Sequence, residues 1–281
     1  MIWRCLWLTA LVAVLVVFGG CGGGSETSIV TSPAVTPAPS RTARPTFSPT
    51  HPVTATPSPA SSSPTPTPPI TTGPAQVIRK GAASRNVVAF SFDAGSDAGY
   101  TAEILDTLAA SGIRGSFGIT GRWAERNPDL LRRIVNEGHG LINHTYDHAS
   151  MTGLSTGLPA QTREERWEEL DRTEAVVADL SGATTKPYFR PPYGDYDASV
   201  NEDVGARGFA YNIMWTVDSG GWRGLPSSEI RQRCLELAEP GAIYVFHVGS
   251  ASQDGPALQG VIDGLRAAGY TIGSVPEVLP H

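Results

Sequence analysis

Short apolar runs alternate with amphipathic runs of helical period through most of the chain, and this alternation limits the fold more than any other feature. The strand-like runs cover residues 86–92, 114–120, 140–143, 188–189, 210–217, 242–247 and 271–273. The helix-like runs between them cover residues 100–111, 127–138, 160–180, 198–207, 227–238 and 256–268. Strands that alternate with helices form parallel βαβ units. We therefore predict an α/β fold, a distorted and incomplete (β/α) barrel of about seven strands.

The N-terminal residues have a different composition. Residues 1–20 carry Arg4, run apolar through Leu6–Phe18 and end in two glycines before Cys21. The apolar run is shorter than the roughly 20 residues that a membrane-spanning helix needs. A charged start, an apolar centre and a small-residue end are typical of a secretory signal. Cys21 after the glycines is similar to the cysteine of a bacterial lipobox, so we predict a lipoprotein signal with lipidation at Cys21. An ordinary signal peptide and a short membrane anchor are the alternatives.

Residues 22–75 form a tract rich in proline, threonine, serine, glycine and alanine. Such a composition buries no core and favours an extended, solvated chain. We interpret the tract as a disordered linker that holds the following domain away from a surface. Residues 76–281 are enough for one domain with a sizeable core.

Charge and cysteine usage exclude some functions. The formal net charge is −6 and no basic stripe is present, so nucleic acid is not an expected partner. Of the three cysteines, only Cys234 falls in the predicted domain, where a buried apolar role is expected. We expect a monomer.

The histidines are few and two of them are paired. Of six histidines, His144 and His148 stand four residues apart in a polar segment. Neutral imidazoles at such a spacing can bind one metal ion, and zinc is the usual choice. The alternative is a pair of loop histidines that bond only to solvent or backbone.

Polar side chains also follow the predicted strands at their carboxyl ends. These are Asp93, His144, Arg190, Asp218 and His247. In (β/α) barrels the chemistry gathers at that end of the strands, so this placement predicts an enzyme.

Each of these residues has a chemical and a structural interpretation. Asp93 is suited to take a proton from a water activated by a bound metal, although an aspartate before Gly95 is also a common turn residue. His247 is suited to protonate a leaving amine, or is a satisfied core histidine. Asp218 would orient a neighbour, and Trp222 would form a flat wall for a sugar ring or belong to the core.

The segment Arg190-Pro191-Pro192-Tyr193-Gly194 has two prolines that fix its backbone and a glycine that permits a positive φ. A fixed loop of this kind can hold the Arg190 guanidinium against Asp93 and present a backbone N–H to an oxyanion. The alternative is a rigid turn with a surface arginine.

Taken in order, these segments resemble the polysaccharide deacetylases with a NodB-homology domain, carbohydrate esterase family 4. The resemblance covers about residues 85–280 and rests on residues 91–95, 144–148, 190–194, 218–222 and 245–247. It implies a distorted (β/α) barrel, Asp93 as base, His144 and His148 as metal ligands, and His247 as acid. Arg190 would orient Asp93, and the Tyr193 N–H would help to bind the oxyanion.

Two positions depart from the family pattern. Ala94 stands where the family usually has a metal-binding aspartate, and Gly221 stands where it usually has an aspartate before the tryptophan. Asp97 in the same loop as Ala94 is our candidate for the missing ligand, with water or substrate as the alternative. The segment Phe92-Asp93 to Gly99-Tyr100-Thr101 is similar to the branch that acts on muramic acid of peptidoglycan.

We therefore expect an exported metal-dependent hydrolase that removes N-acetyl groups from peptidoglycan or a related polysaccharide. Its cofactor would be a divalent metal, with zinc expected and cobalt or nickel as the alternatives. It would be anchored by lipid to the outer face of the bacterial cytoplasmic membrane or be secreted. A non-catalytic glycan-binding lipoprotein on the same scaffold is one alternative, and an esterase that removes O-acetyl groups is another.

Overall fold

The computed structural model describes residues 73–279. The predicted signal of residues 1–20, Cys21 and all but the last residues of the predicted linker lie outside this range, and those predictions remain untested. Within it, no helix is both long enough and apolar enough to cross a membrane.

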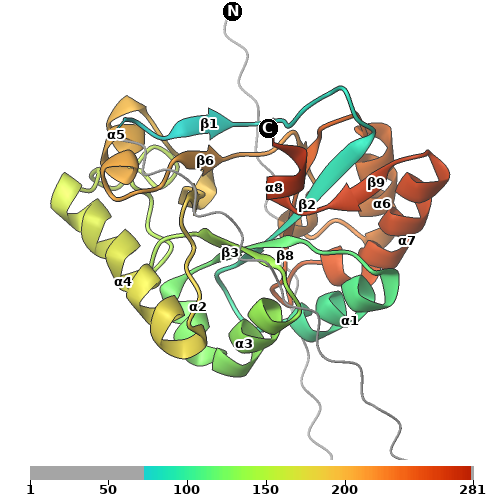
Figure 1. The fold of residues 1–281 in the computed structure, drawn as a ribbon, viewed down its shortest axis with the longest axis horizontal. Coiled ribbons are helices and arrows are strands. Elements are labelled where there is room, and N and C mark those ends of the chain that lie inside the picture. The colour runs from blue at the N-terminus through green and yellow to red at the C-terminus, as the bar shows by residue number, and fades with distance from the viewer. Residues whose placement is uncertain (1–72, 280–281) are drawn as a thin grey trace, which may run out of the picture. The chain divides into compact units, whose positions relative to one another are not determined.

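Parallel strands form one sheet that curls into an open half-barrel (Figure 1). Their order is β1-β6-β5-β4-β3-β2-β8-β7, and β9 also pairs with β2. The strands are β1 (Gln76–Ile78), β2 (Val87–Ala94), β3 (Ser116–Ile119), β4 (Gly140–Asn143), β5 (Tyr188–Phe189), β6 (Tyr211–Ile213), β7 (Val217–Asp218), β8 (Ile243–His247) and β9 (Thr271–Gly273). The prediction of a distorted, incomplete (β/α) barrel is confirmed.

Helices cover the outer side of the sheet, with α4, α2, α3, α1 and α7 following one another around its rim in Figure 1. The helices are α1 (Thr101–Ser111), α2 (Gly121–Arg126), α3 (Pro128–Asn136), α4 (Arg163–Ser181), α5 (Ala198–Ala206), α6 (Ser227–Glu236), α7 (Asp254–Ala267) and α8 (Val275–Val278). Two short 3₁₀ helices are η1 (Pro192–Gly194) and η2 (Gly221–Arg223).

Local signals in the sequence explain where the helices begin and end. The Thr162 hydroxyl accepts from the backbone N–H of Glu165 while the Glu165 carboxylate accepts from that of Thr162, a capping box that starts α4. Gly112 follows α1 with φ 62°, and Pro128 occupies the first turn of α3, which are common positions for glycine and proline at helix ends.

The expected run 210–217 is two separate strands, which is one reason why the structure has more strands than the seven predicted. β6 lies next to the edge strand β1, and β7 forms the opposite edge of the sheet. β6 pairs with β1 and β5, whereas β7 pairs with β8. Between them, the Met214 N–H donates to the Ile78 carbonyl and the Thr216 N–H to the Ile243 carbonyl. The chain therefore crosses the gap in the barrel, which periodicity alone does not reveal. Strand β1 and helices α2 and α8 were also missed because they are short.

The alternation of side chains along β2 separates the core from the barrel interior. Phe90 and Phe92 pack outward against the helices, in contact with other aromatic rings from β3 and β8. Ala94 belongs to this same outer cluster. Ala89 faces the interior, where branched residues from several strands fill the base of the barrel. Ser91 and Asp93 share the face of Ala89 by this alternation. Cys234 is buried in α6, as predicted.

A buried ion pair connects α4 to α5 and gives a test of this packing. Arg166 Nη1 lies 2.9 Å from Asp203 Oδ2, and the Arg166 side chain is only 6% exposed. Arg163 reaches the other oxygen of Asp203 at 2.6 Å but is 54% exposed. We expect Arg166→Met to lower the free energy of unfolding by about 3 kcal/mol, because the buried Asp203 carboxylate loses its buried positively charged partner. The matched Arg163→Ala should lower it by less than about 1 kcal/mol. Denaturant unfolding measures both, and equal losses would contradict this account of the α4–α5 contact.

Candidate active site

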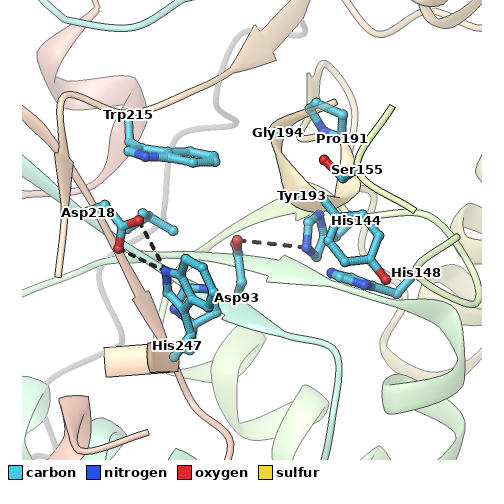
Figure 2. Close-up of a pocket in the computed structure, with 12 residues that line it drawn as sticks. Asp93, His144, His148, Ser155, Pro191, Tyr193, Gly194, Trp215, Asp218 and His247 are labelled. Atoms are coloured by element: carbon cyan, nitrogen blue, oxygen red, sulfur yellow. Dashed lines mark hydrogen bonds and ion pairs between the residues drawn. The ribbon is translucent and has the colours of Figure 1, made fainter. Parts of the chain in front are cut away.

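A cavity of about 360 Å³ opens at the carboxyl ends of the strands. Figure 2 shows Asp93 within it, between His144 and His247. Of the predicted site residues, those that line it are Asp93, His144, His148, Tyr193, Asp218, Trp222 and His247. The strand-end argument therefore brought the correct side chains together. Arg190 lies directly beneath the cavity, fully buried and bonded to Asp93.

Arg190 holds several parts of the site in place. Its Nη1 donates to Asp93 Oδ1 at 2.7 Å, its Nη2 to the Ser91 hydroxyl at 2.8 Å, and its Nε to the Ile213 carbonyl at 2.8 Å. Its backbone carbonyl lies 2.8 Å from His144 Nδ1. One residue thus orients both the candidate base and a candidate ligand.

The Asp93 carboxylate is buried yet kept ionised. Burial alone would raise its pKa, but the nearby charges of Arg190, His144 and His247 and the bond from Arg190 together hold the pKa below its ordinary value. The carboxylate therefore stabilises the fold at neutral pH, and this contribution is lost as the pH falls through the lowered pKa. Gly118, opposite Asp93 on β3, makes room for it, since a Cβ there would lie 2.4 Å from Asp93 Oδ1.

His144 and His148 meet edge to face, with ring centres 4.8 Å apart. The bond between His144 Nδ1 and the Arg190 carbonyl places the proton on Nδ1 and leaves Nε2 unprotonated, 3.7 Å from Asp93 Oδ2. Burial lowers the pKa of His144, and burial together with the His144 charge lowers the pKa of His148 to about 4. Both imidazoles are neutral near pH 7, as metal ligands must be.

The backbone around the site is strained. Thr145, His148 and Tyr193 have φ of 64°, 67° and 60°, and no other non-glycine residue among residues 73–279 has a positive φ. Such conformations cost of order 1 kcal/mol or more each and gather at functional sites. The strain aims His148 and Tyr193 at each other, with ring centres 4.8 Å apart.

His247 ends β8 directly beside Asp93, because the two residues are paired in register between β8 and β2. Burial would lower its pKa, but the carboxylates of Asp254, Asp93 and Asp218 together raise it above the ordinary value. A histidine that holds its proton more tightly than usual, next to an ionised Asp93, is suited to general acid–base chemistry.

Aromatic side chains form the walls of the cavity. Trp222 is 55% exposed, and its Nε1 donates to both carboxylate oxygens of Asp218, at 3.1 and 3.3 Å. Asp218 therefore orients a neighbour, as expected, and that neighbour is Trp222. Tyr193 is also exposed at the rim.

Two residues that line the cavity were not predicted. Trp215 lies on the segment that crosses the gap in the barrel, with its ring 5.7 Å from the Arg190 guanidinium carbon. Ser155 lies in the long loop before α4 and donates to Asp195. The cluster of tryptophans near Asp218 was a signal for Trp215, whereas nothing local marks Ser155.

The Asp97 carboxylate does not lie beside His144 and His148. Its Oδ1 accepts from the Ser250 N–H at 2.8 Å and its Oδ2 from the Ser250 hydroxyl at 2.6 Å. No group of three histidine, cysteine or acidic side chains within residues 73–279 is arranged to hold a metal. The expectation that Asp97 supplies the third ligand is therefore wrong for this geometry. The reason is that the Ser250 loop takes up both of its oxygens.

The two imidazoles fit a divalent metal ion, and the protein supplies no third ligand beside them in the described range. Ala94 cannot serve, because it has no ligand atom and packs in the outer cluster. A metal held here would therefore complete its coordination with water or substrate.

Comparison with known proteins places the chain. A family model described as polysaccharide deacetylase matches residues 80–211. The chain belongs to this family. It is 32% identical to a peptidoglycan-N-acetylglucosamine deacetylase of Bacillus cereus over 63% of its length, and spans 60% of that protein. It is 28% identical to a peptidoglycan-N-acetylmuramic acid deacetylase of Bacillus subtilis, covering 71% of this chain and 73% of that protein.

A solved structure of the same family is also similar. It is a carbohydrate esterase family 4 pseudoenzyme from Bacillus anthracis, 25% identical, with a TM-score of 0.66. The match covers 73% of this chain and 69% of that one. The scaffold therefore occurs both in named deacetylases and in a protein described as a pseudoenzyme.

The Arg190–Asp93 pair gives a test of the site's electrostatics. We expect Arg190→Met to lower the free energy of unfolding at pH 7 by about 3–5 kcal/mol, because Asp93 is left buried without its charge partner. The loss should shrink at acid pH, where Asp93 becomes protonated. The double variant Arg190→Met, Asp93→Asn should be more stable at pH 7 than Arg190→Met alone. A double variant no more stable than the single one would contradict the pairing.

Proposed function

We propose that this protein is a metal-dependent hydrolase that removes N-acetyl groups from peptidoglycan or a related N-acetylated polysaccharide. One observation carries the proposal: an ionised Asp93 and His247, with its raised pKa, lie side by side on paired strands, next to two neutral imidazoles. Hydrolysis of an amide needs a base for the attacking water and an acid for the departing nitrogen. The family and the two named relatives, both peptidoglycan deacetylases, support this chemistry.

The residues of the site have distinct roles in the proposed reaction. Asp93 accepts a proton from the attacking water, and Arg190 keeps its carboxylate ionised and correctly oriented. His247 gives its proton to the sugar nitrogen as the bond to the acetyl carbon breaks. The Tyr193 N–H, on the strained turn of η1, stabilises the negative charge on the carbonyl oxygen.

We assign a divalent metal to His144 and His148, with zinc preferred over cobalt or nickel for this donor pair. When bound there, the metal supplies Lewis-acid polarisation of the acetamide carbonyl. The chain's own contribution is to hold both imidazoles neutral, buried and in a fixed orientation.

The surroundings of the cavity suit a polymer. His148 and Tyr193 also border a second hollow of about 490 Å³ on the side of the loop before α4. Trp222 and His247 border a third of about 290 Å³, which is also lined by Ser96 and Gly249. Exposed aromatic rings at Trp222 and Tyr193 offer flat apolar faces to sugar rings. A substrate that extends past the reacting sugar on both sides fits this series of hollows.

The location and anchoring of the protein belong to the same proposal. A cell-wall substrate requires export, and the N-terminal segment has the pattern of a lipoprotein signal. We place residues 76–281, the deacetylase domain, outside the cell, carried on the linker of residues 22–75. Lipid on Cys21 would anchor it at the outer face of the cytoplasmic membrane, and cleavage without lipidation would release it.

A second candidate function is glycan binding without catalysis. The absence of a third ligand among the described residues favours it, as does the similarity to a family pseudoenzyme. Such a protein would keep the cavity and its aromatic walls but release no acetate.

Zinc binding separates the residues that hold the metal from those that do not. We expect His148→Gln to weaken zinc binding by about tenfold or more, because it removes one of two protein ligands. Asp97→Ala should leave the affinity unchanged, since Asp97 bonds to Ser250. Isothermal titration of the three proteins measures this. If Asp97→Ala weakens binding as much as His148→Gln does, Asp97 is a ligand after all.

Acetate release tests the proposed reaction. We expect the zinc-loaded protein to release acetate from peptidoglycan, and Asp93→Asn to slow this by at least about 10²-fold because the base is lost. Asp218→Asn, which keeps a side chain of the same shape beside Trp222, should chiefly raise KM. Unimpaired release by Asp93→Asn would refute the assigned base. Saturable binding without release by the native protein would favour the second candidate, and release only from O-acetylated polymer would identify an esterase.

A further inference from the structure

Two buried polar atoms next to the cavity lack hydrogen-bond partners within residues 73–279. They are Nδ1 of His247 and Oδ1 of Asp254. The Asp254 side chain is 1% exposed, and its other oxygen, Oδ2, lies 3.8 Å from His247 Nδ1. A buried polar atom without a partner carries a free-energy cost, so two such atoms in neighbouring residues call for an explanation.

Asp254 is held firmly against the strand that carries His247. It is the first residue of α7, and its Oδ2 accepts from the His247 backbone N–H at 2.7 Å and from the Ser219 hydroxyl at 3.0 Å. The carboxylate is therefore fixed from both β8 and the loop after β7. A closure of about 1 Å would bring it within hydrogen-bond distance of His247 Nδ1.

The position of Asp254 depends on Gly221. A Cβ at residue 221 would lie 2.4 Å from Asp254 Oδ1 and 2.5 Å from its carboxyl carbon. It would also lie 2.3 Å from the Ser252 hydroxyl. No side chain at residue 221 can therefore share this space with Asp254. Gly221 is one of the two departures from the family pattern, which usually has an aspartate before the tryptophan.

The other acidic groups that face His247 are already engaged. Asp93 from β2 is bonded to Arg190, and Asp218 from β7 is bonded to Trp222 and to the Gly220 N–H. Asp254 from α7 is the remaining carboxylate, and its Oδ1 is fully buried with no hydrogen-bond partner in the described range.

We propose that Asp254 is a positioning residue that pairs with His247 Nδ1, so that α7 supplies the carboxylate which the family usually carries at residue 221. The proposal rests on the proposed function, in which His247 is the acid. A carboxylate at Nδ1 fixes the tautomer and directs Nε2–H into the cavity, and it stabilises the protonated ring until its proton is given up. In this proposal the carboxylate is not lost but comes from residue 254, and the glycine at residue 221 leaves room for it.

The first experiment uses the native full-length chain and its Asp254→Asn variant, which is the same size. We expect about a tenfold or larger fall in kcat for acetate release with KM little changed, because an amide cannot stabilise the protonated ring. The limb of the pH profile that reports the acid should move to lower pH. A purely structural Asp254 would alter the melting temperature and leave the profile in place.

Nuclear magnetic resonance of ¹⁵N-histidine protein follows His247 directly, with His247→Gln to identify its signals. In Asp254→Asn the midpoint of the His247 titration should move to lower pH. This readout needs no activity, so it still decides the pairing if the native protein releases no acetate and the proposed function fails. An unmoved midpoint would overturn the proposal.

The second experiment exchanges the two positions. Gly221→Asp alone should impair acetate release, because its side chain collides with Asp254. In the double variant Gly221→Asp, Asp254→Ala the collision is gone and the carboxylate comes from residue 221. The double variant should therefore release acetate at least about fivefold faster than Asp254→Ala alone, which corresponds to about 1 kcal/mol of activation free energy. A double variant no faster than Asp254→Ala would count against the exchange.

Discussion

The ion pair between Arg190 and Asp93 determines the geometry of this site. It is buried, and a buried pair of charges is stable only if every bond around it is made. Arg190 meets that condition through Ser91, the Ile213 carbonyl and Asp93, and its own carbonyl fixes the ring of His144. The candidate base and one candidate ligand therefore depend on one residue, which directly follows a third strand, β5. The geometry of the candidate site is a consequence of satisfying the hydrogen bonds of one buried cation.

Much of the fold could be predicted because its signals are local. Alternating runs predicted the parallel barrel, and Gly112 and Pro128 marked helix ends correctly. The run 210–217 was wrongly predicted to be one strand, because strand propensity does not indicate which neighbouring strand a segment will pair with. Its two ends pair with strands that are far apart in the sheet, β6 with β5 and β7 with β8. Partner choice is a tertiary property, and so is the placement of Trp215 that follows from it.

The site was predictable to a similar extent and for similar reasons. Strand ends located Asp93, His144, Arg190, Asp218 and His247, since parallel strands bring their carboxyl ends together. Asp97 was assigned by nearness in sequence to Ala94, and the structure binds it to Ser250 instead. Asp254 went unnoticed because it starts a helix rather than follows a strand. A contact between segments that are distant in the sequence gives no local sequence pattern from which it could be predicted.

The backbone is strained at Thr145, His148 and Tyr193, all of which lie at or next to the candidate site. Elsewhere among residues 73–279 the left-handed conformation is always taken by glycine, which adopts it freely. Thr145, His148 and Tyr193 adopt the same conformation although each has a Cβ, which makes it less favourable for them than for glycine. The side chains at these three positions are therefore held at a cost in backbone strain, which is common where side chains form a functional site.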